Sequence, residues 1–191
     1  HGVSVRCDST LTMQFCRVFQ NAMVGVLIAN SEGPIEKCQV HENGFSGIQV
    51  NAGLQDVRLI ENTLYGNGTE QMCIAGSAAP LIEGNRIHDG KEACGISCIG
   101  FAKPVIKGNE MWGHPDAHIY MRENASPMIQ GNTIRDGGAS GIFICDEARP
   151  TVEGNVQRRS AVWAAQNRSS RATLSMMGEL RGFSALKMYG A

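Results

Sequence analysis

The sequence repeats itself at a nearly fixed interval, and this repeat constrains the fold more than any other feature. One register holds Cys16, Cys38, Asn62, Asn85, Asn109, Asn132 and Asn155. A second register, each member followed by an apolar-x-apolar triplet, holds Gly2, Gly25, Gly47, Gln71, Gly95, His118 and Gly141. Successive members of both registers lie 22 to 24 residues apart. A fixed period of this length indicates that each repeat is one structural unit, which buries its apolar face only by stacking on its neighbours.

Within each repeat, apolar and polar residues alternate over a few positions, which is the period of a β-strand. The clearest pair of repeats runs over residues 80–90 and 127–137, where a proline opens one strand and Asp-Gly closes another. Strands this short and a repeat this brief leave no room for a βα unit, so we expect a coil of three short strands. Stacked coils form a parallel β-helix, in which equivalent residues of neighbouring coils lie about 4.8 Å apart.

The inward positions of such coils form four columns that are apolar throughout. The first two are Val3, Val26, Ile48, Met72, Ile96, Ile119, Ile142 and Val5, Ile28, Val50, Ile74, Cys98, Met121, Ile144. The others are Met13, Ile35, Leu59, Ile82, Ile106, Ile129, Val152 and Val18, Val40, Leu64, Ile87, Met111, Ile134. The sequence therefore predicts an all-β, single-stranded parallel β-helix, a solenoid of about seven coils over residues 1–156.

The asparagine register has a physical explanation in this fold, because stacked amides can hydrogen-bond to one another inside a turn. We expect this structural ladder to comprise Asn62, Asn85, Asn109, Asn132 and Asn155. Cys16 and Cys38 hold the same place in the first two coils, where a small buried thiol also fits. A bridge between these two cysteines across stacked coils is the alternative.

The motif Pro-x-Ile-x-Gly-Asn-x-Ile-x-Asp-Gly, followed by Gly-Ile-x-Ile, resembles the repeat of the carbohydrate-binding and sugar-hydrolase (CASH) group of right-handed parallel β-helices. It is most similar to the β-helical part of F-box-only ubiquitin-ligase adaptors and to NosD-like proteins. The resemblance implies the fold and covers about four-fifths of the chain. It is only weakly specific for activity, because the shared residues are core, turn and ladder positions.

Composition excludes several classes of partner. A net charge of -1, a pI of about 6.6 and 6% aromatic residues argue against a nucleic-acid partner. No apolar run reaches the roughly 20 residues that span a bilayer. The seven cysteines are an odd number, and several fall on inward positions, which favours free thiols in an intracellular, reducing compartment. His1 opens directly on a repeat triplet, so we expect the native polypeptide to begin earlier.

One coil departs from the repeat and supplies the candidate chemistry. His114, Asp116 and His118 replace turn glycines there, and Tyr120 and Arg122 follow on the outward side. These residues are the candidates for an acid/base cluster acting on an acidic polysaccharide, with arginine neutralising a uronate. The alternative is a loop with ordinary surface histidines, which we favour.

Other candidate chemistry is explained by the repeat. Asp89 and Asp136 share a register with Asn43 and Asn67, so we interpret both as turn residues rather than as a glycosidase pair. The histidines also have metal-binding donor types, but Cys98 on the next coil faces inward and no paired ligand motif occurs. No metal or other cofactor is expected.

The outward residues of the triplets form a candidate binding face. It comprises Leu27, Gln49, Tyr120 and Phe143, and it becomes aromatic toward the C-terminal end. Coverage of this face by a loop or by the C-terminal tail is the alternative. Residues 157–191 leave the repeat and contain six Arg or Lys against one Glu, which predicts a basic cap or tail.

Two functions follow from these patterns. The first is a non-catalytic protein-binding or scaffolding β-helix, a subunit or substrate-recognition part of a larger complex. The alternative is a carbohydrate-active enzyme, a lyase, epimerase or hydrolase, centred on His114 and His118. The repeat explains nearly every polar residue without catalysis, so it favours the binding module.

Overall fold

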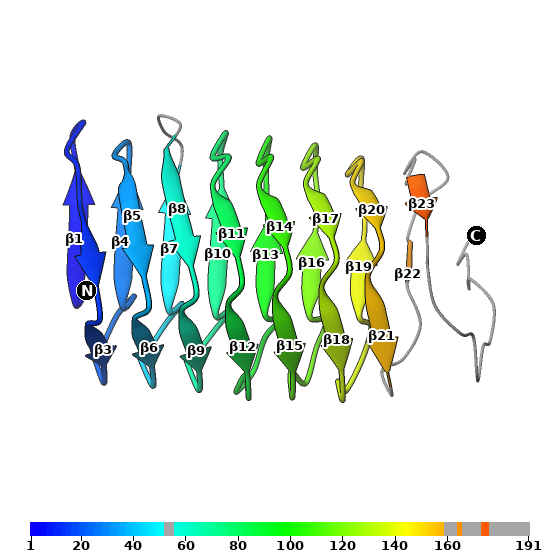
Figure 1. Cartoon of the computed structure of the whole chain (residues 1–191), viewed down its shortest axis with the longest axis horizontal. Coiled ribbons are helices and arrows are strands. Elements are labelled where there is room, and N and C mark those ends of the chain that lie inside the picture. The colour runs from blue at the N-terminus through cyan, green and yellow to red at the C-terminus, as the bar shows by residue number, and fades with distance from the viewer. Residues whose placement is uncertain (52–55, 159–163, 166–172, 176–191) are drawn as a thin grey trace.

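The computed structural model describes residues 1–51, 56–158, 164–165 and 173–175. Within these residues the chain consists of short strands joined by tight turns, and none of them lies in a helix. Figure 1 shows the strands wound into a row of stacked coils that runs from the N-terminus toward the C-terminus. The all-β parallel solenoid that the sequence predicts is confirmed.

Every described strand pairs in parallel with equivalent strands of the neighbouring coils, which produces three long sheets. The first sheet contains β1 (Val3–Arg6), β4 (Val26–Ala29), β7 (Ile48–Asn51), β10 (Met72–Ala75), β13 (Ile96–Cys98), β16 (Ile119–Met121), β19 (Ile142–Ile144) and β22 (Ala164–Ala165). The second contains β2 (Met13–Gln14), β5 (Gly33–Glu36), β8 (Val57–Ile60), β11 (Leu81–Glu83), β14 (Val105–Lys107), β17 (Met128–Gln130), β20 (Thr151–Glu153) and β23 (Thr173–Ser175). The third contains β3 (Arg17–Phe19), β6 (Gln39–His41), β9 (Thr63–Tyr65), β12 (Arg86–His88), β15 (Glu110–Trp112), β18 (Thr133–Arg135) and β21 (Val156–Arg158).

The core lies between the three sheets and consists mainly of the four apolar columns. Strand register places each inward residue against its equivalent one coil away, as with Ile82 and Ile106 in β11 and β14. Ile82, Ile106 and Ile129 are all fully buried. Burying one such side chain contributes about 1.5–3 kcal/mol, so the stacking of coils is the main source of stability.

The corner that follows each third-sheet strand requires a left-handed backbone, and this corrects the register assigned to two aspartates. Asp89 and Asp136 have φ values of 47° and 51°, which confirms that they are turn residues. However, Asp89 aligns with Gly66, whose N–H donates to the Asp89 carbonyl at 3.0 Å. The expected alignment with Asn43 and Asn67 is therefore wrong by one residue. Asp and Asn both have short polar side chains that tolerate this backbone conformation. Both residue types are therefore typical of turns, which made the two positions look equivalent in the sequence.

Strand stacking continues beyond residue 156, the predicted end of the solenoid. β21 spans that boundary, and β22 and β23 pair with β19 and β20. Most of the expected basic cap or tail, residues 157–191, lies outside the described residues.

Candidate functional site

Asparagine side chains stack along the corner between the second and third sheets. This asparagine ladder comprises Asn62, Asn85, Asn109, Asn132 and Asn155, all of them buried. Asn109 is representative, because its Nδ2 donates to Asn132 Oδ1 at 2.9 Å and to the Ile82 carbonyl at 2.9 Å. The Asn109 backbone N–H donates to the same Asn132 oxygen, also at 2.9 Å. These amides satisfy one another in the interior, so they do not face a ligand.

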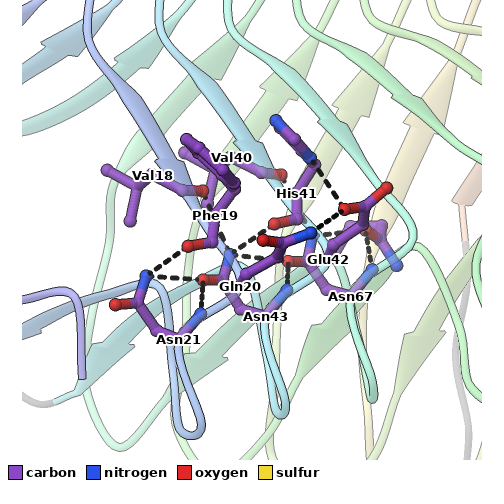
Figure 2. Close-up of polar contacts among 10 residues, drawn as sticks. Val18, Phe19, Gln20, Asn21, Val40, His41, Glu42, Asn43 and Asn67 are labelled. Carbon is purple, nitrogen blue, oxygen red and sulfur yellow. Dashed lines mark hydrogen bonds and ion pairs between the residues drawn. The ribbon is translucent and has the colours of Figure 1, made fainter.

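A second row of polar side chains fills the corner between the third and first sheets, and Figure 2 shows its first three members. Asn21 Nδ2 donates to Asn43 Oδ1 at 2.8 Å, and Asn43 Nδ2 donates to Asn67 Oδ1 at 2.9 Å. Asn67 Nδ2 then donates to Gln71 Oε1 at 2.6 Å, which ends the run of stacked asparagines. The polarity of this corner is therefore continuous across several coils.

Each coil has space for one large side chain at this corner, and we call this space the turn slot. A Cβ added to Gly47 would lie 2.7 Å from Asn67 Nδ2, so a second side chain does not fit. The same close approach pairs Gly2 with Asn21, Gly25 with Asn43, Gly47 with Asn67, Gly95 with His114, and Gly137 with His118. Gln71 and Gly90 hold the equivalent positions of their coil, where a Cβ on Gly90 would lie 3.6 Å from Gln71 Nε2 and 2.8 Å from the His114 ring. In every pair one residue is glycine and its counterpart supplies the side chain.

Two histidines occupy the turn slot in the later coils. His114 and His118 are 1% and 0% exposed, and their rings meet edge to face with centroids 5.0 Å apart. His118 Nε2 lies 3.0 Å from the carbonyl oxygen of Arg135, so we assign the proton to Nε2 as the donor. Burial lowers the pKa of His114 to about 3, with smaller contributions from His118 and His88, and burial also lowers the pKa of His118. Both imidazoles are therefore neutral near pH 7.

Aromatic rings stack along the outer face of the third sheet. This aromatic column comprises Phe19, His41, Tyr65, His88 and Trp112, with Arg135 over the last ring. Neighbouring ring centroids lie 4.3 to 5.2 Å apart, and the ring planes are within 12° of parallel. The guanidinium carbon of Arg135 lies 4.5 Å from the centroid of the Trp112 ring. Because the rings cover one another's faces, the exposed members of the column present mainly ring edges to solvent, whereas His41 is buried.

The edges of the aromatic column carry hydrogen-bond donors. Neither the Tyr65 hydroxyl nor Trp112 Nε1 has a hydrogen-bond partner within the part of the chain that the structure describes. The exposed Arg17 guanidinium lies 5.2 Å from the Phe19 ring centroid and forms no ion pair with a described residue. An indole N–H and a guanidinium donate but cannot accept, so this edge suits an acceptor-rich ligand.

Carboxylates also border the aromatic column, in the corners that follow three of the third-sheet strands, β6, β12 and β18. They lie beside cationic or imidazole groups of the column: Glu42 3.8 Å from His41 (Figure 2), Asp89 2.8 Å from His88, and Asp136 3.1 Å from Arg135. Arg135 also contacts Glu110 at 3.0 Å, and Arg86 lies 4.0 Å from the same glutamate. Most charges beside the column are thus compensated, and Arg17 is the exposed exception among the described arginines of this sheet.

Comparison with known proteins agrees with this architecture. Residues 25–174 match the family described as "Right handed beta helix region". This match covers well over half of the chain. The chain belongs to the right-handed β-helix family. No curated protein and no solved structure matches it.

This right-handed β-helix does not assemble the acid/base cluster considered from the sequence. His114 and His118 point into the turn slot, whereas Asp116 and Arg122 are exposed. Tyr120 lies on the outer face of β16, and its ring stacks on Phe143. The expectation of ordinary surface histidines is also wrong, because the glycines that share their slots allow both rings to turn inward.

The outer face of the first sheet is less exposed than its sequence indicates. Leu27 is only 6% exposed, and Gln49 Nε2 donates to Asn51 Oδ1 at 3.0 Å. Tyr120 and Phe143 stack with centroids 5.6 Å apart and ring planes 6° from parallel. A hydrogen bond with the Cys145 thiol and burial raise the pKa of Tyr120 to about 12. A binding role for these four residues stays a prediction.

The aromatic column was not recognised from the sequence, although a signal for it is present. Each of its members directly follows a residue of the fourth apolar column, as Tyr65 follows Leu64 and Trp112 follows Met111.

Within the described residues, no helix is long and apolar enough to cross a membrane. The same residues contain no group of three or more His, Cys, Asp or Glu side chains placed to hold a metal ion.

Proposed function

We propose that this right-handed β-helix is a non-catalytic binding module that holds an acidic segment of a protein partner against the aromatic column. The observation that carries the proposal is the alignment of Tyr, Trp and Arg side chains along one sheet face. These three residue types are enriched among the energetic hot spots of protein interfaces. A stacked solenoid is rigid, so little conformational entropy is lost when such a face binds.

Hydrogen-bond donors without a partner favour an acidic partner segment. Tyr65, Trp112 and Arg17 present donors that have no acceptor among the described residues. A carboxylate or a backbone carbonyl supplies the missing acceptor, and an arginine–carboxylate bond is charge-assisted. The similarity of the repeat to the β-helical part of F-box-only ubiquitin-ligase adaptors favours a substrate-recognition part of a larger assembly.

A carbohydrate-active enzyme has less support. Its proposed catalytic histidines are buried in the turn slot, with ring nitrogens that do not reach solvent. Sugar rings pack on open aromatic faces, whereas the faces in this column are occupied by neighbouring rings. An acidic polysaccharide nevertheless shares the carboxylates of an acidic peptide, so the experiment must separate the two.

The test uses a fluorescein-labelled peptide of twelve glutamates and measures fluorescence anisotropy with the intact chain at low salt. We expect Trp112→Ala to weaken binding about tenfold and Arg17→Ala about fivefold, as for interface anchors. Phe101→Ala is the matched control, because Phe101 is 63% exposed but lies between β13 and β14, away from the third sheet. Its affinity should stay within about twofold of the wild type.

Unlabelled polygalacturonate is the competing ligand. If it displaces the peptide at lower carboxylate concentration than free polyglutamate does, the partner is a polysaccharide and the proposal is wrong. Equal affinity of the Trp112→Ala variant and the wild type would also reject the aromatic column as the binding site. Circular dichroism of each variant verifies that the solenoid remains folded.

A further inference from the structure

Two cysteines lie directly above one another in neighbouring coils, at the corner that elsewhere holds the asparagine ladder. Strand register fixes the position on both sides, because Gln14 pairs with Glu36 and Arg17 pairs with Gln39. Cys16 and Cys38 are therefore one strand spacing apart, about 4.8 Å. This spacing falls within the range of about 4.4–6.8 Å that Cα atoms of a disulfide require.

The two thiols have the same orientation. Cys16 Sγ lies 3.2 Å from the carbonyl oxygen of Gln14, and Cys38 Sγ lies 3.2 Å from that of Glu36. The Cys16 backbone N–H donates to Cys38 Sγ at 3.4 Å, so the two residues are in contact. Cys16 is exposed, which corrects the expectation of two buried thiols, whereas Cys38 is 1% exposed.

A thiol is a poor substitute for asparagine at this corner. An amide donates to two or three acceptors and accepts from the previous coil, whereas a thiol is a weak donor and a weak acceptor. The Cys38 backbone N–H still donates to Asn62 Oδ1 at 2.9 Å, but among the described residues neither cysteine has an equivalent of the side-chain bond from Asn62 Nδ2 to Asn85 Oδ1. An accessible thiol next to a second thiol is, however, the arrangement of redox-sensing cysteines. The accessible sulfur reacts with the oxidant, and the second sulfur then forms a disulfide with it.

We propose that Cys16 and Cys38 are a peroxide-sensitive thiol pair that is oxidised to a disulfide joining the first two coils. Cys16 sulfur attacks one oxygen of hydrogen peroxide, the O–O bond breaks, and Cys16 sulfenic acid and one water form. Cys38 sulfur then attacks Cys16 sulfur, the S–O bond breaks, and the hydroxyl leaves as a second water with the Cys38 proton. The two thiols lose two electrons, which reduce the peroxide to water. This inference is independent of the proposed protein partner.

The experiment treats the intact, reduced chain with hydrogen peroxide and follows its intact mass and its free thiols. We expect the loss of about 2 Da and of two thiols, and a peptide map that links the Cys16 peptide to the Cys38 peptide. Dithiothreitol should restore both thiols. Because the bond closes a loop of 22 residues, the oxidised chain should also melt about 10 °C higher.

Matched serine variants supply the controls. Cys7 is the other exposed cysteine, so Cys7→Ser should oxidise as the wild type does. Cys38→Ser should instead leave Cys16 as a sulfenic or sulfinic acid, with a mass gain of about 16 or 32 Da. The proposal fails if the wild type gains oxygen at Cys16 while Cys38 stays a free thiol, or if the disulfide joins Cys7. It also fails if peroxide leaves both thiols unchanged.

Discussion

The burial of His114 predicts a specific weakness toward acid. Burial lowers the pKa of its imidazole from 6.5 to about 3, because charging the ring inside the turn slot is unfavourable. In the unfolded chain the imidazole titrates near 6.5. Below that pH the unfolded state binds a proton that the folded state does not, so protonation favours unfolding. The stability is intact above pH 6.5 and decreases as the pH falls from 6.5 toward 3.

The magnitude follows from the separation between the pH and the unfolded pKa. One pH unit corresponds to about 1.36 kcal/mol, so at pH 5 the loss from His114 is about 2 kcal/mol. This value depends little on the folded pKa, provided that it lies well below 5. The loss is a substantial part of the total stability of an ordinary domain, which is about 5–15 kcal/mol.

The assay is urea denaturation at pH 7 and pH 5 for the wild type and for His114→Asn. Asparagine is the matched replacement, because Asn21, Asn43 and Asn67 fill the same corner position in other coils. The wild type should lose about 2 kcal/mol more than the variant between the two pH values. Comparison of the two chains cancels the titration of carboxylates, which both contain. An equal pH dependence in the two proteins, or an NMR titration of His114 in the folded wild type near pH 6.5, would refute the argument.

Two further experiments test the interior. Asn109→Ala should destabilise the chain by about 2–4 kcal/mol in urea denaturation, because it leaves several buried groups without a hydrogen-bond partner. Gln130→Ala on the outer surface should cost under about 0.5 kcal/mol. Similar costs for the two variants would show that the asparagine ladder is not stabilising. His118→Gly and Gly137→Asn should each destabilise, but the double variant should recover about 1–2 kcal/mol of their sum, because it restores one side chain per turn slot. Strict additivity in thermal melts of the four proteins would contradict the shared slot.

The architecture was predictable because stacking imposes the same demand on every coil. An inward residue such as Ile82 must contact its equivalents one coil away, so apolar identity recurs at the repeat and is visible in one sequence. The asparagine register was visible for the same reason. Each coil contacts only its neighbours, so equivalent positions recur at a fixed interval and can be found from the period of the sequence alone.

The candidate site was harder to predict because no single residue recurs in it. In the turn slot, the large side chain comes from one of two positions and glycine from the other, and this choice changes from coil to coil. His118 interrupts a column of glycines, and only its contact with Gly137 explains why it is buried. The aromatic column repeats a chemical class and not one residue type, since Phe19, Tyr65 and Trp112 each carry an aromatic ring but are different amino acids. A search for identical residues passes over such a column, whereas a search for stacked π systems finds it.

The turn slot also determines where a coil can be inserted or removed without damage. The two residues that share a slot lie 18 to 20 positions apart and belong to the same coil, with the first directly before a first-sheet strand. A duplication of residues 95–117 copies both members of a pair, so the new coil carries its own compatible corner. A duplication of residues 80–102, which begins where the visible repeat begins, instead joins Gly95 of the first copy to Gly90 of the second and leaves that slot without a side chain. The unit of growth in this solenoid therefore begins at the glycine before the first-sheet strand, and not at the proline that marks the repeat in the sequence.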